Sequence, residues 1–294
     1  MPLPKFDYYS PRTLAEACSF LSQHKGKARV IAGGTDLLVK MGDRKLAPQY
    51  LVGLKGISDL DYIKHDAPEG LRIGALATNQ AIANSPVIRE RFGCLAEAAG
   101  EMGTVQVRNL GTIGGNLCNA APSADVAPPL IALGARLKLV SPRGERIIEA
   151  EEFFAGPGET VLMADEILAE VQVPKQPAET QAVYLRLSQR SQVDIAAVGV
   201  AVSVTVGREG VCNEARIALG AVAPTPIRAR KAEEAIKGKR IDDDLINRAA
   251  QLAAEESRPI SDIRSSADYR REMVKVLTKR AMKQAVERVK SGRR

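Results

Sequence analysis

Two glycine doublets are the residues of this chain whose type and spacing best fit a chemical task. Gly33-Gly34 and Gly114-Gly115 each follow an apolar segment and precede a small polar side chain. Glycine adopts backbone conformations closed to other residues, so two tight turns of this kind can each direct several backbone N–H groups at one anion. The pair therefore predicts a site for an anionic group such as a pyrophosphate.

Short polar side chains accompany both doublets. Thr35 and Asp36 follow the first and Asn116 follows the second, and each can hydrogen-bond a phosphate or a ribose. Further along, Asp125 falls in the first turn of a helix that Ser123 is expected to cap at residue 124. As such an acid it either stabilises its helix or binds a ligand hydroxyl, and the residues alone leave both interpretations open.

Other familiar site motifs are absent from the sequence. It contains no G-x-G-x-x-G, no G-x-x-x-x-G-K-[ST], no H-E-x-x-H and no G-x-S-x-G. The four cysteines are scattered without a C-x-x-C pair, and only two histidines occur, so no metal or iron–sulfur site is expected in this chain. Cys18 and Cys212 lie in apolar segments and are expected to be buried, reduced thiols.

Composition indicates a globular protein large enough for more than one domain. Hydrophobic residues make up 45% and charged residues 26% of the 294 residues. No apolar run approaches the eighteen or more residues of a membrane span, and a charge near the start argues against a signal peptide. We therefore expect no membrane span and a cytoplasmic location.

The net charge of +7 is concentrated in the C-terminal third of the chain. From residue 228 onward there are 19 Lys and Arg against 11 Asp and Glu, and the remainder is close to neutral. The excess is interleaved with acids along amphipathic helices, and aromatic residues for base stacking make up only 4%. A solvated helical face or a partner-docking surface is favoured over nucleic-acid binding.

The elements that must position the first doublet form a small βαβ-type unit. Thr13 and Glu16 make a capping box that opens a helix, and residues 29–32 are expected to form a buried strand that ends at the doublet. A helical turn at 37–41 and a strand at 50–54 complete the unit.

The second doublet lies in a longer pattern of hairpins and helices. Strands 62–65 and 71–75 are expected to pair, Thr78 to cap a helix, and another helix to run over 86–100. A second hairpin pairs 136–140 with 146–149, and a strand at 167–173 closes this part. Residues 175–180 form the expected linker.

The remainder of the chain reads as an α+β domain. Strands are expected at 184–187, 195–206 and 211–221, followed by helices at about 228–237, 242–257 and 266–290. The predicted sheet is three-stranded and antiparallel with three helices.

The two glycine segments, with their neighbours, carry a family resemblance. Residues 32–37 (AGGTDL), 106–117 (QVRNLGTIGGNL) and 121–125 (APSAD) resemble the FAD-binding medium subunits of the molybdenum hydroxylases. This family includes xanthine dehydrogenases, aldehyde oxidoreductases and aerobic carbon monoxide dehydrogenases. Later segments also match, among them Asp194-Ile195-Ala196 and Asp268-Tyr269-Arg270. The resemblance extends over nearly the whole chain.

The resemblance implies a fold and a cofactor. It predicts an α+β protein with two N-terminal α/β subdomains, at 1–57 and 58–176, that form a PCMH-type FAD-binding domain, and a C-terminal α+β domain at 181–290. FAD would lie between the two subdomains, with its pyrophosphate against the glycine turns. The residues expected to bind it are Val30, Ile31, Ala32, Gly33, Gly34, Thr35, Asp36, Leu37, Thr112, Ile113, Gly114, Gly115, Asn116, Asp125, Leu168, Arg186 and Ile195.

Two of these positions depart from the usual family residue. Arg186 stands where relatives often have Lys, and its rigid planar fork implies a different contact. Ile195 stands near the flavin where some relatives have an aromatic residue, which would leave the ring more open to an electron acceptor. The turn Gly-Gly-Thr-Asp, in place of Gly-Gly-His-Ser, favours a xanthine- or aldehyde-type complex over a carbon monoxide dehydrogenase.

The resemblance also implies partners. A large subunit with molybdenum cofactor would transform the substrate, and a small subunit with [2Fe-2S] clusters would relay electrons to the FAD of this chain, which would pass them to NAD+ or another acceptor. The alternatives are a stand-alone FAD-dependent NADH oxidoreductase and a binding module that uses the basic C-terminal part.

Overall fold

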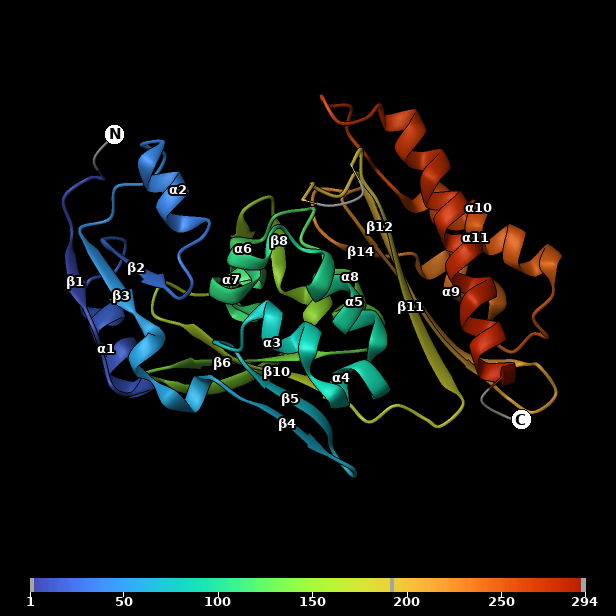
Figure 1. Cartoon of the computed structure of the whole chain (residues 1–294), viewed down its shortest axis with the longest axis horizontal. Helices are drawn as coiled ribbons and strands as arrows, with labels where there is room; N and C mark the ends of the chain where they lie inside the picture. The colour runs from blue at the N-terminus through green and yellow to red at the C-terminus, as the bar shows by residue number, and fades with distance from the viewer. Residues whose placement is uncertain (1–2, 191–192, 292–294) are drawn as a thin grey trace.

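The computed structural model describes residues 3–190 and 193–291, and its strands form three main sheets that follow one another along the chain. Figure 1 shows them side by side, with the N-terminal sheet in blue, the middle sheet in cyan to green and the C-terminal sheet in yellow to orange. Helices cover the middle and C-terminal sheets. No described helix is long and apolar enough to cross a membrane.

The first sheet is parallel, with strand order β1-β3-β2. Helix α1 begins where predicted, because the Thr13 hydroxyl accepts a hydrogen bond from the N–H of Glu16. The predicted βαβ unit is confirmed by the parallel pairing of β2 with β3 around α2. The elements are β1 (Asp7–Tyr9), α1 (Leu14–Gln23), β2 (Ala28–Ile31), α2 (Leu37–Gly42) and β3 (Tyr50–Gly53).

The second sheet is antiparallel, with strand order β4-β5-β10-β6-β7. It confirms both predicted hairpins and places the strand predicted at 167–173 at its centre. Its strands are β4 (Ile63–Asp66), β5 (Gly70–Gly74), β6 (Arg136–Ser141), β7 (Gly144–Glu149) and β10 (Ile167–Pro174).

Six short helices lie between β5 and β6, and short 3-10 turns and a two-stranded ribbon complete this part. The helices are α3 (Asn79–Asn84), α4 (Pro86–Arg91), α5 (Gly93–Glu101), α6 (Val105–Leu110), α7 (Ile113–Asn119) and α8 (Ala127–Ala132). The other elements are η1 (Leu54–Gly56), η2 (Ser58–Leu60), η3 (Ala150–Glu152), β8 (Phe154–Gly156) and β9 (Glu159–Thr160).

Two predicted helices differ from the structure. The helix expected over 86–100 is divided at Phe92, whose backbone leaves the helical region at φ −135°. The helix expected from residue 124 begins at Ala127. A proline lacks the N–H of a helix interior and is tolerated in the first turn, so Pro128 and Pro129 place the start of α8 later than Ser123 and Asp125 would.

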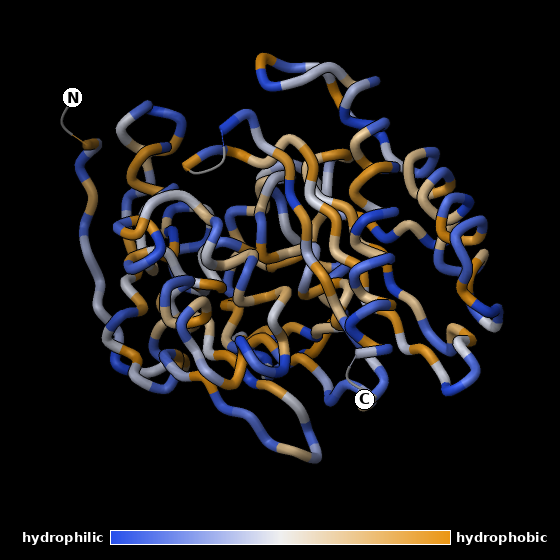
Figure 2. The backbone as a smooth tube through the Cα atoms, turned by 45° about the vertical axis from the view of Figure 1, so that its right-hand side comes forward, coloured by the Kyte–Doolittle hydropathy of each residue, from blue (hydrophilic) through white to orange (hydrophobic). Residues whose placement is uncertain are grey.

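The third sheet is antiparallel and has four strands, because a short strand adds to the three that were predicted. Its elements are β11 (Thr180–Leu187), β12 (Val198–Val206), β13 (Cys212–Gly220), β14 (Ile227–Arg228), α9 (Arg230–Ile236), α10 (Asp243–Glu256) and α11 (Ala267–Ser291). Helix α11 packs on one face of this sheet and α8 on the other. Every residue of β12 is therefore buried. Figure 2 shows hydrophilic and hydrophobic stretches alternating along the outer helices, as amphipathic helices require.

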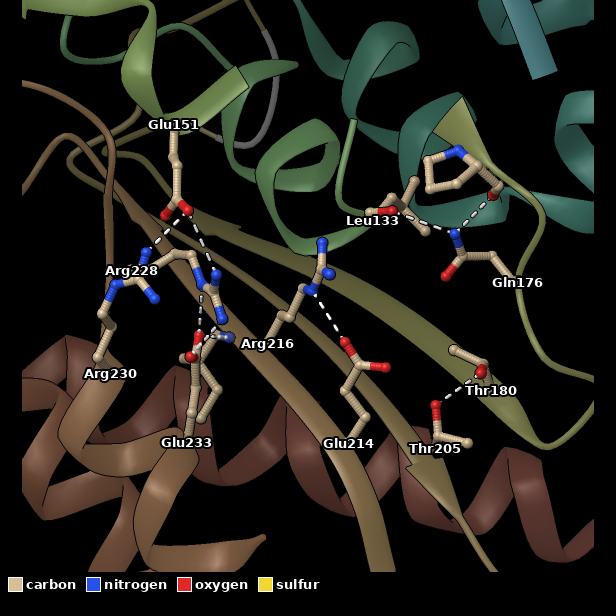
Figure 3. A network of polar contacts seen from close by, with 12 residues as sticks. Leu133, Glu151, Gln176, Thr180, Thr205, Glu214, Arg216, Arg228, Arg230 and Glu233 are labelled. Carbon is tan, nitrogen blue, oxygen red and sulfur yellow. Dashed lines mark hydrogen bonds and ion pairs between the residues drawn. The ribbon is translucent and has the colours of Figure 1, made fainter. Parts of the chain in front are cut away.

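Polar contacts join the second and third sheets where their elements meet (Figure 3). The carboxylate of Glu151, in η3, accepts hydrogen bonds from Arg228 at 3.4 Å and Arg230 at 2.8 Å. The Gln176 side chain, in the segment between β10 and β11, donates to the carbonyl of Leu133 after α8 at 3.1 Å and so ties this connecting segment to the second part. The Glu151 contacts therefore link η3 of the second part to β14 and α9 of the third.

Candidate functional site

A cavity of about 1410 Å³ lies between the first sheet and the helices of the second. The loop after β2, the first turns of α7, the strand β10 and two loops of the third sheet's domain line it. Ligand pockets are commonly about 300–1,000 Å³, so this cavity has room for an extended molecule of dinucleotide size.

The loop after β2 has the properties expected of an anion-binding turn. Gly34 adopts φ +76°, a conformation that favours glycine. No described residue accepts a hydrogen bond from the backbone N–H groups of Gly34, Thr35 or Asp36. Successive free N–H groups in such a turn attract anions.

Gly33 brings the two doublet segments into contact. A Cβ atom at this position would lie 2.1 Å from the carbonyl oxygen of Leu110. Only glycine allows the loop after β2 to approach the end of α6 this closely. The first glycine of the first doublet thus serves close packing, whereas the second serves the turn.

The second doublet lies in the first turn of helix α7, and its prediction as a tight turn with free N–H groups is wrong. Ile113 and Gly114 donate to the carbonyls of Ala77 and Ala75. Gly115 donates to the Thr112 hydroxyl at 3.0 Å and Asn116 to the Thr112 carbonyl at 2.9 Å. Thr112 and the segment after β5 therefore accept the hydrogen bonds from the N–H groups that were predicted to bind an anionic ligand.

The two glycines of this doublet face different surroundings. A Cβ on Gly114 would lie 2.7 Å from the Cβ of Ala75, so this glycine allows α7 to pack on the end of β5. A Cβ on Gly115 would meet only the Thr112 hydroxyl, at 3.0 Å, and would otherwise point into open space. Gly115 is the glycine of the pair that leaves room in the cavity.

Asp125 lines the cavity from a turn before α8 and not from a helix. The interpretation of Asp125 as a first-turn helix acid is therefore excluded. Its carboxylate accepts a hydrogen bond from the Tyr184 hydroxyl at 2.9 Å and lies 3.5 Å from the Nε of Arg186. Burial raises the pKa of Asp125 to about 6, although Arg186 and Tyr184 oppose this shift.

Two of the residues expected to bind the cofactor do not line the cavity. The side chain of Ile113 is fully buried in the core around the second sheet. Arg186 is 6% exposed and donates to the carbonyls of Glu101 at 3.0 Å and Asp194 at 2.6 Å. Arg186 therefore lies behind the cavity wall, where it links α5 to the segment that carries Ile195.

The remaining predicted residues all line the cavity. Leu168 does so from β10 and is 3% exposed, whereas Ile195 does so from a loop of the third domain and is 47% exposed. The others are Val30, Ile31, Ala32, Gly33, Gly34, Thr35, Asp36, Leu37, Thr112, Gly114, Gly115, Asn116 and Asp125.

Among the polar residues of the cavity that the sequence did not predict are Lys40, Asn79 and Asn119. Lys40 of α2 donates to the Oδ1 of Asn119 at 2.6 Å and so bridges the cavity from α2 to α7. Asn79 is fully buried, and its Oδ1, like that of Asn116, has no hydrogen-bond partner among the described residues.

No cluster of described residues is suited to hold a metal ion, and Cys18 and Cys212 are buried as predicted. Cys118 lines the cavity. Burial raises the pKa of the Cys118 thiol to about 12, so it stays protonated and unreactive at neutral pH.

Sequence comparison identifies the family. A family model described as the FAD binding domain in molybdopterin dehydrogenase matches residues 4–176, and one described as the CO dehydrogenase flavoprotein C-terminal domain matches residues 183–285. The chain belongs to the FAD-binding medium subunits of the molybdenum hydroxylases. Its cofactor is FAD, as the resemblance of the glycine segments implied.

Individual medium subunits are similar to this chain over nearly its whole length. The glyceraldehyde dehydrogenase medium chain of Sulfolobus acidocaldarius is 34% identical over 96% of this chain and 98% of its own. The nicotinate dehydrogenase FAD-subunit of Eubacterium barkeri is 31% identical over 98% of each. A chain of the carbon monoxide dehydrogenase from Hydrogenophaga pseudoflava has the same fold, with a TM-score of 0.94 and 35% identity over 98% of this chain and 99% of that one.

Proposed function

We propose that this medium subunit holds FAD in the 1410 Å³ cavity and uses it to carry electrons between partner subunits and a terminal acceptor. The observation that carries the proposal is the pairing of a cavity of dinucleotide size with three unsatisfied N–H groups at one wall, at Gly34, Thr35 and Asp36. Free N–H groups of this kind fit the pyrophosphate of FAD.

Unpaired polar atoms of the cavity fit the remainder of the cofactor. The buried Oδ1 atoms of Asn79 and Asn116 can each accept a hydrogen bond from an N–H or O–H group of a ligand. Lys40 adds a positive charge close to the loop after β2. The carboxyl of Asp125, already bonded to Tyr184, remains a candidate for a ligand hydroxyl. These contacts support the predicted site as a whole, with Ile113 and Arg186 in supporting positions.

The redox chemistry is that of the flavin, which exchanges electrons one or two at a time, and the protein binds and orients it. By family resemblance, the electrons come from a molybdenum-containing large subunit through the [2Fe-2S] clusters of a small subunit, and NAD+ or another acceptor receives them. Leu168 and the apolar wall keep water from the cofactor, and the exposed Ile195 leaves one end of the cavity accessible.

The substrate of the complex is not encoded in this chain. Relatives of comparable identity are named for glyceraldehyde, nicotinate and carbon monoxide. Selection of substrate by the large subunit explains this spread, and the preference for a xanthine- or aldehyde-type complex stays a prediction. The domain boundaries at 1–57, 58–176 and 181–290 and the cytoplasmic location also stay predictions.

The decisive experiment is purification of the full chain and release of its cofactor. We expect a yellow protein that binds FAD in a ratio of about one to one and releases it on denaturation, because the cavity has one set of phosphate-binding N–H groups. Chromatography of the released flavin identifies it. A folded, colourless protein that takes up no FAD on reconstitution would contradict the proposal.

A stand-alone FAD-dependent NADH oxidoreductase is the alternative function, and kinetics separates the two. An electron-carrying subunit should reduce an acceptor slowly on its own and should co-purify with larger and smaller partners. Sustained NADH turnover by the isolated chain, with no co-purifying subunit, would favour the alternative.

A further inference from the structure

Arg270 of α11 is a buried charged residue that joins three separate segments. Its side chain is 4% exposed. One guanidinium nitrogen donates to the carbonyl of Ala197 at 2.9 Å and to that of Ala221 at 3.0 Å. The other donates to the carboxylate of Asp262 at 2.6 Å. The guanidinium thus connects the start of β12, the end of β13 and the 258–266 loop.

The 258–266 loop is organised around the Asp262 carboxylate. The N–H groups of Arg264 and Ser265 donate to its Oδ1 at 2.8 Å and 3.2 Å. Burial opposes ionisation of Asp262, but the Arg264 N–H and the Arg270 guanidinium outweigh it and lower the pKa of this carboxyl to about 2. The carboxylate is therefore charged at neutral pH and binds Arg270 as an ion pair.

Apolar packing does not hold this loop in place. Ile260 is 70% exposed and Ile263 is 93% exposed. Figure 1 shows the loop projecting from the N-terminal end of α11, and Figure 2 shows its mostly hydrophilic course with an apolar tip. With so little buried apolar surface, its position depends on hydrogen bonds and on the Arg270–Asp262 ion pair.

The loop also forms part of the cavity. Ile263 and Arg264 line it. Their carbonyls accept hydrogen bonds from the Gln189 side chain at 3.4 Å and 2.8 Å, and Gln189 itself lines the cavity. The segment that Arg270 and Asp262 hold therefore forms one edge of the cavity mouth.

We propose that Arg270 is a positioning residue for the FAD site, which acts through Asp262 to hold the 258–266 loop over the cavity mouth and so sets the rates at which FAD enters and leaves. The inference rests on the proposed location of FAD in this cavity. A loop held over the mouth slows both uptake and release. If Arg270 only stabilised the third sheet, its substitution would weaken FAD binding by faster release alone, and the rate of FAD uptake would not change.

The test compares FAD binding kinetics of full-length variants. Arg270→Lys keeps the charge but loses the fork that reaches two carbonyls and a carboxylate. Asp262→Asn keeps an acceptor for the loop N–H groups but loses the ion pair. Arg271→Lys is the matched control, because Arg271 is 44% exposed and pairs only with Asp268 among the described residues. Flavin fluorescence follows uptake by the apoprotein, and trapping of free FAD by an excess of another apo-flavoprotein follows release.

We expect Arg270→Lys and Asp262→Asn to speed both uptake and release by about tenfold, the effect of losing one charged hydrogen bond, and Arg271→Lys to match the wild type. Hydrogen exchange of the amides at 263–266 should rise in both variants. Unchanged rates in folded variants, or faster release without faster uptake, would overturn the proposal. If Arg270→Lys does not fold, Asp262→Asn alone decides by the same criteria.

A wild-type chain that takes up no FAD would contradict the proposed function. In that case hydrogen exchange still decides whether Arg270 holds the loop, because this measurement needs no cofactor. Unchanged exchange at 263–266 in Asp262→Asn would then reject the positioning role as well.

Discussion

The carboxyl of Asp125 lies in the wall of the cavity with little access to water. It is 6% exposed and has Tyr184, Arg186 and Glu101 as polar neighbours. Burial disfavours its charged form more than Arg186 and Tyr184 favour it, so its pKa is about 6 in the folded chain against 3.8 for an aspartate in water. Between these two values the folded chain holds a proton that the unfolded chain has released.

This difference predicts a pH dependence of stability. The unfolding free energy of the apoprotein should fall as pH rises from about 4 to 6, by roughly 3 kcal/mol, and level off above 6. Asp125→Asn keeps an acceptor for Tyr184 and should lose this slope. Urea unfolding at several pH values measures it. Asp59→Asn, at an exposed position, is the control, and an identical slope in Asp125→Asn would contradict the assignment.

The position of Gly114 and Gly115 in the first turn of helix α7 determines the structural role of the second doublet. Its Thr112 cap satisfies the N–H of Gly115, and its first turn docks on the segment after β5 through Gly114. The glycines are therefore needed for close packing and for an open cavity wall, whereas the backbone N–H groups of Gly34, Thr35 and Asp36, which are unpaired among the described residues, lie in the loop after β2.

The two glycines of α7 should respond differently to substitution. Gly114→Ala places a methyl group 2.7 Å from the Cβ of Ala75 and should lower the unfolding free energy by about 1–3 kcal/mol. Gly115→Val meets only the Thr112 hydroxyl and should leave stability within about 1 kcal/mol while it lowers FAD content, because its side chain enters the cavity. Thermal unfolding and flavin content per folded protein measure both. Full FAD occupancy in folded Gly115→Val would count against this placement.

The cavity is lined by residues of both the second and the third sheets' domains, so its shape requires that these two domains pack against each other. Ala221 donates to the carbonyl of Pro122 at 2.7 Å, next to the turn that carries Asp125. Glu151 binds two arginines of the third domain (Figure 3). The cavity mouth is thus built from segments of two domains, and its shape depends on the joint between them.

Glu151 provides a test of this joint. Its side chain is 24% exposed and pairs with Arg228 and Arg230, so Glu151→Gln should lower the unfolding free energy by about 1 kcal/mol. Glu145→Gln removes an exposed pair with Lys138 within one hairpin and should cost less than about 0.5 kcal/mol. Thermal unfolding compares the two variants. Equal effects would show that the Glu151 contacts add nothing to the joint.

Local patterns predicted most of the elements. The Thr13 cap of α1 and both hairpins are confirmed because they depend on residues close in the chain, although the Glu16 carboxylate accepts from the N–H of Arg12 and not from that of Thr13 as in a full capping box. The strand predicted at 167–173 is confirmed as well. The start of α8 was predicted too early because the cap signal of Ser123 outweighed two prolines that follow it. Arg186 was predicted to bind the cofactor from its position in a family motif. Only the structure shows that its guanidinium donates hydrogen bonds to the backbone carbonyls of Glu101 and Asp194.

The family and the FAD cofactor could be inferred from the chain's motifs, and most of the residues predicted to bind FAD do line the cavity. Which N–H groups remain free could not be inferred. Those of Ile113 and Gly114 are taken by carbonyls more than thirty residues away, at Ala77 and Ala75. The hydrogen-bond partners of Asn79 and Lys40, and the two carbonyls that accept from Arg270, likewise lie more than thirty residues away. Hydrogen-bond satisfaction is a property of the packed molecule, because each donor binds the acceptor that folding places beside it.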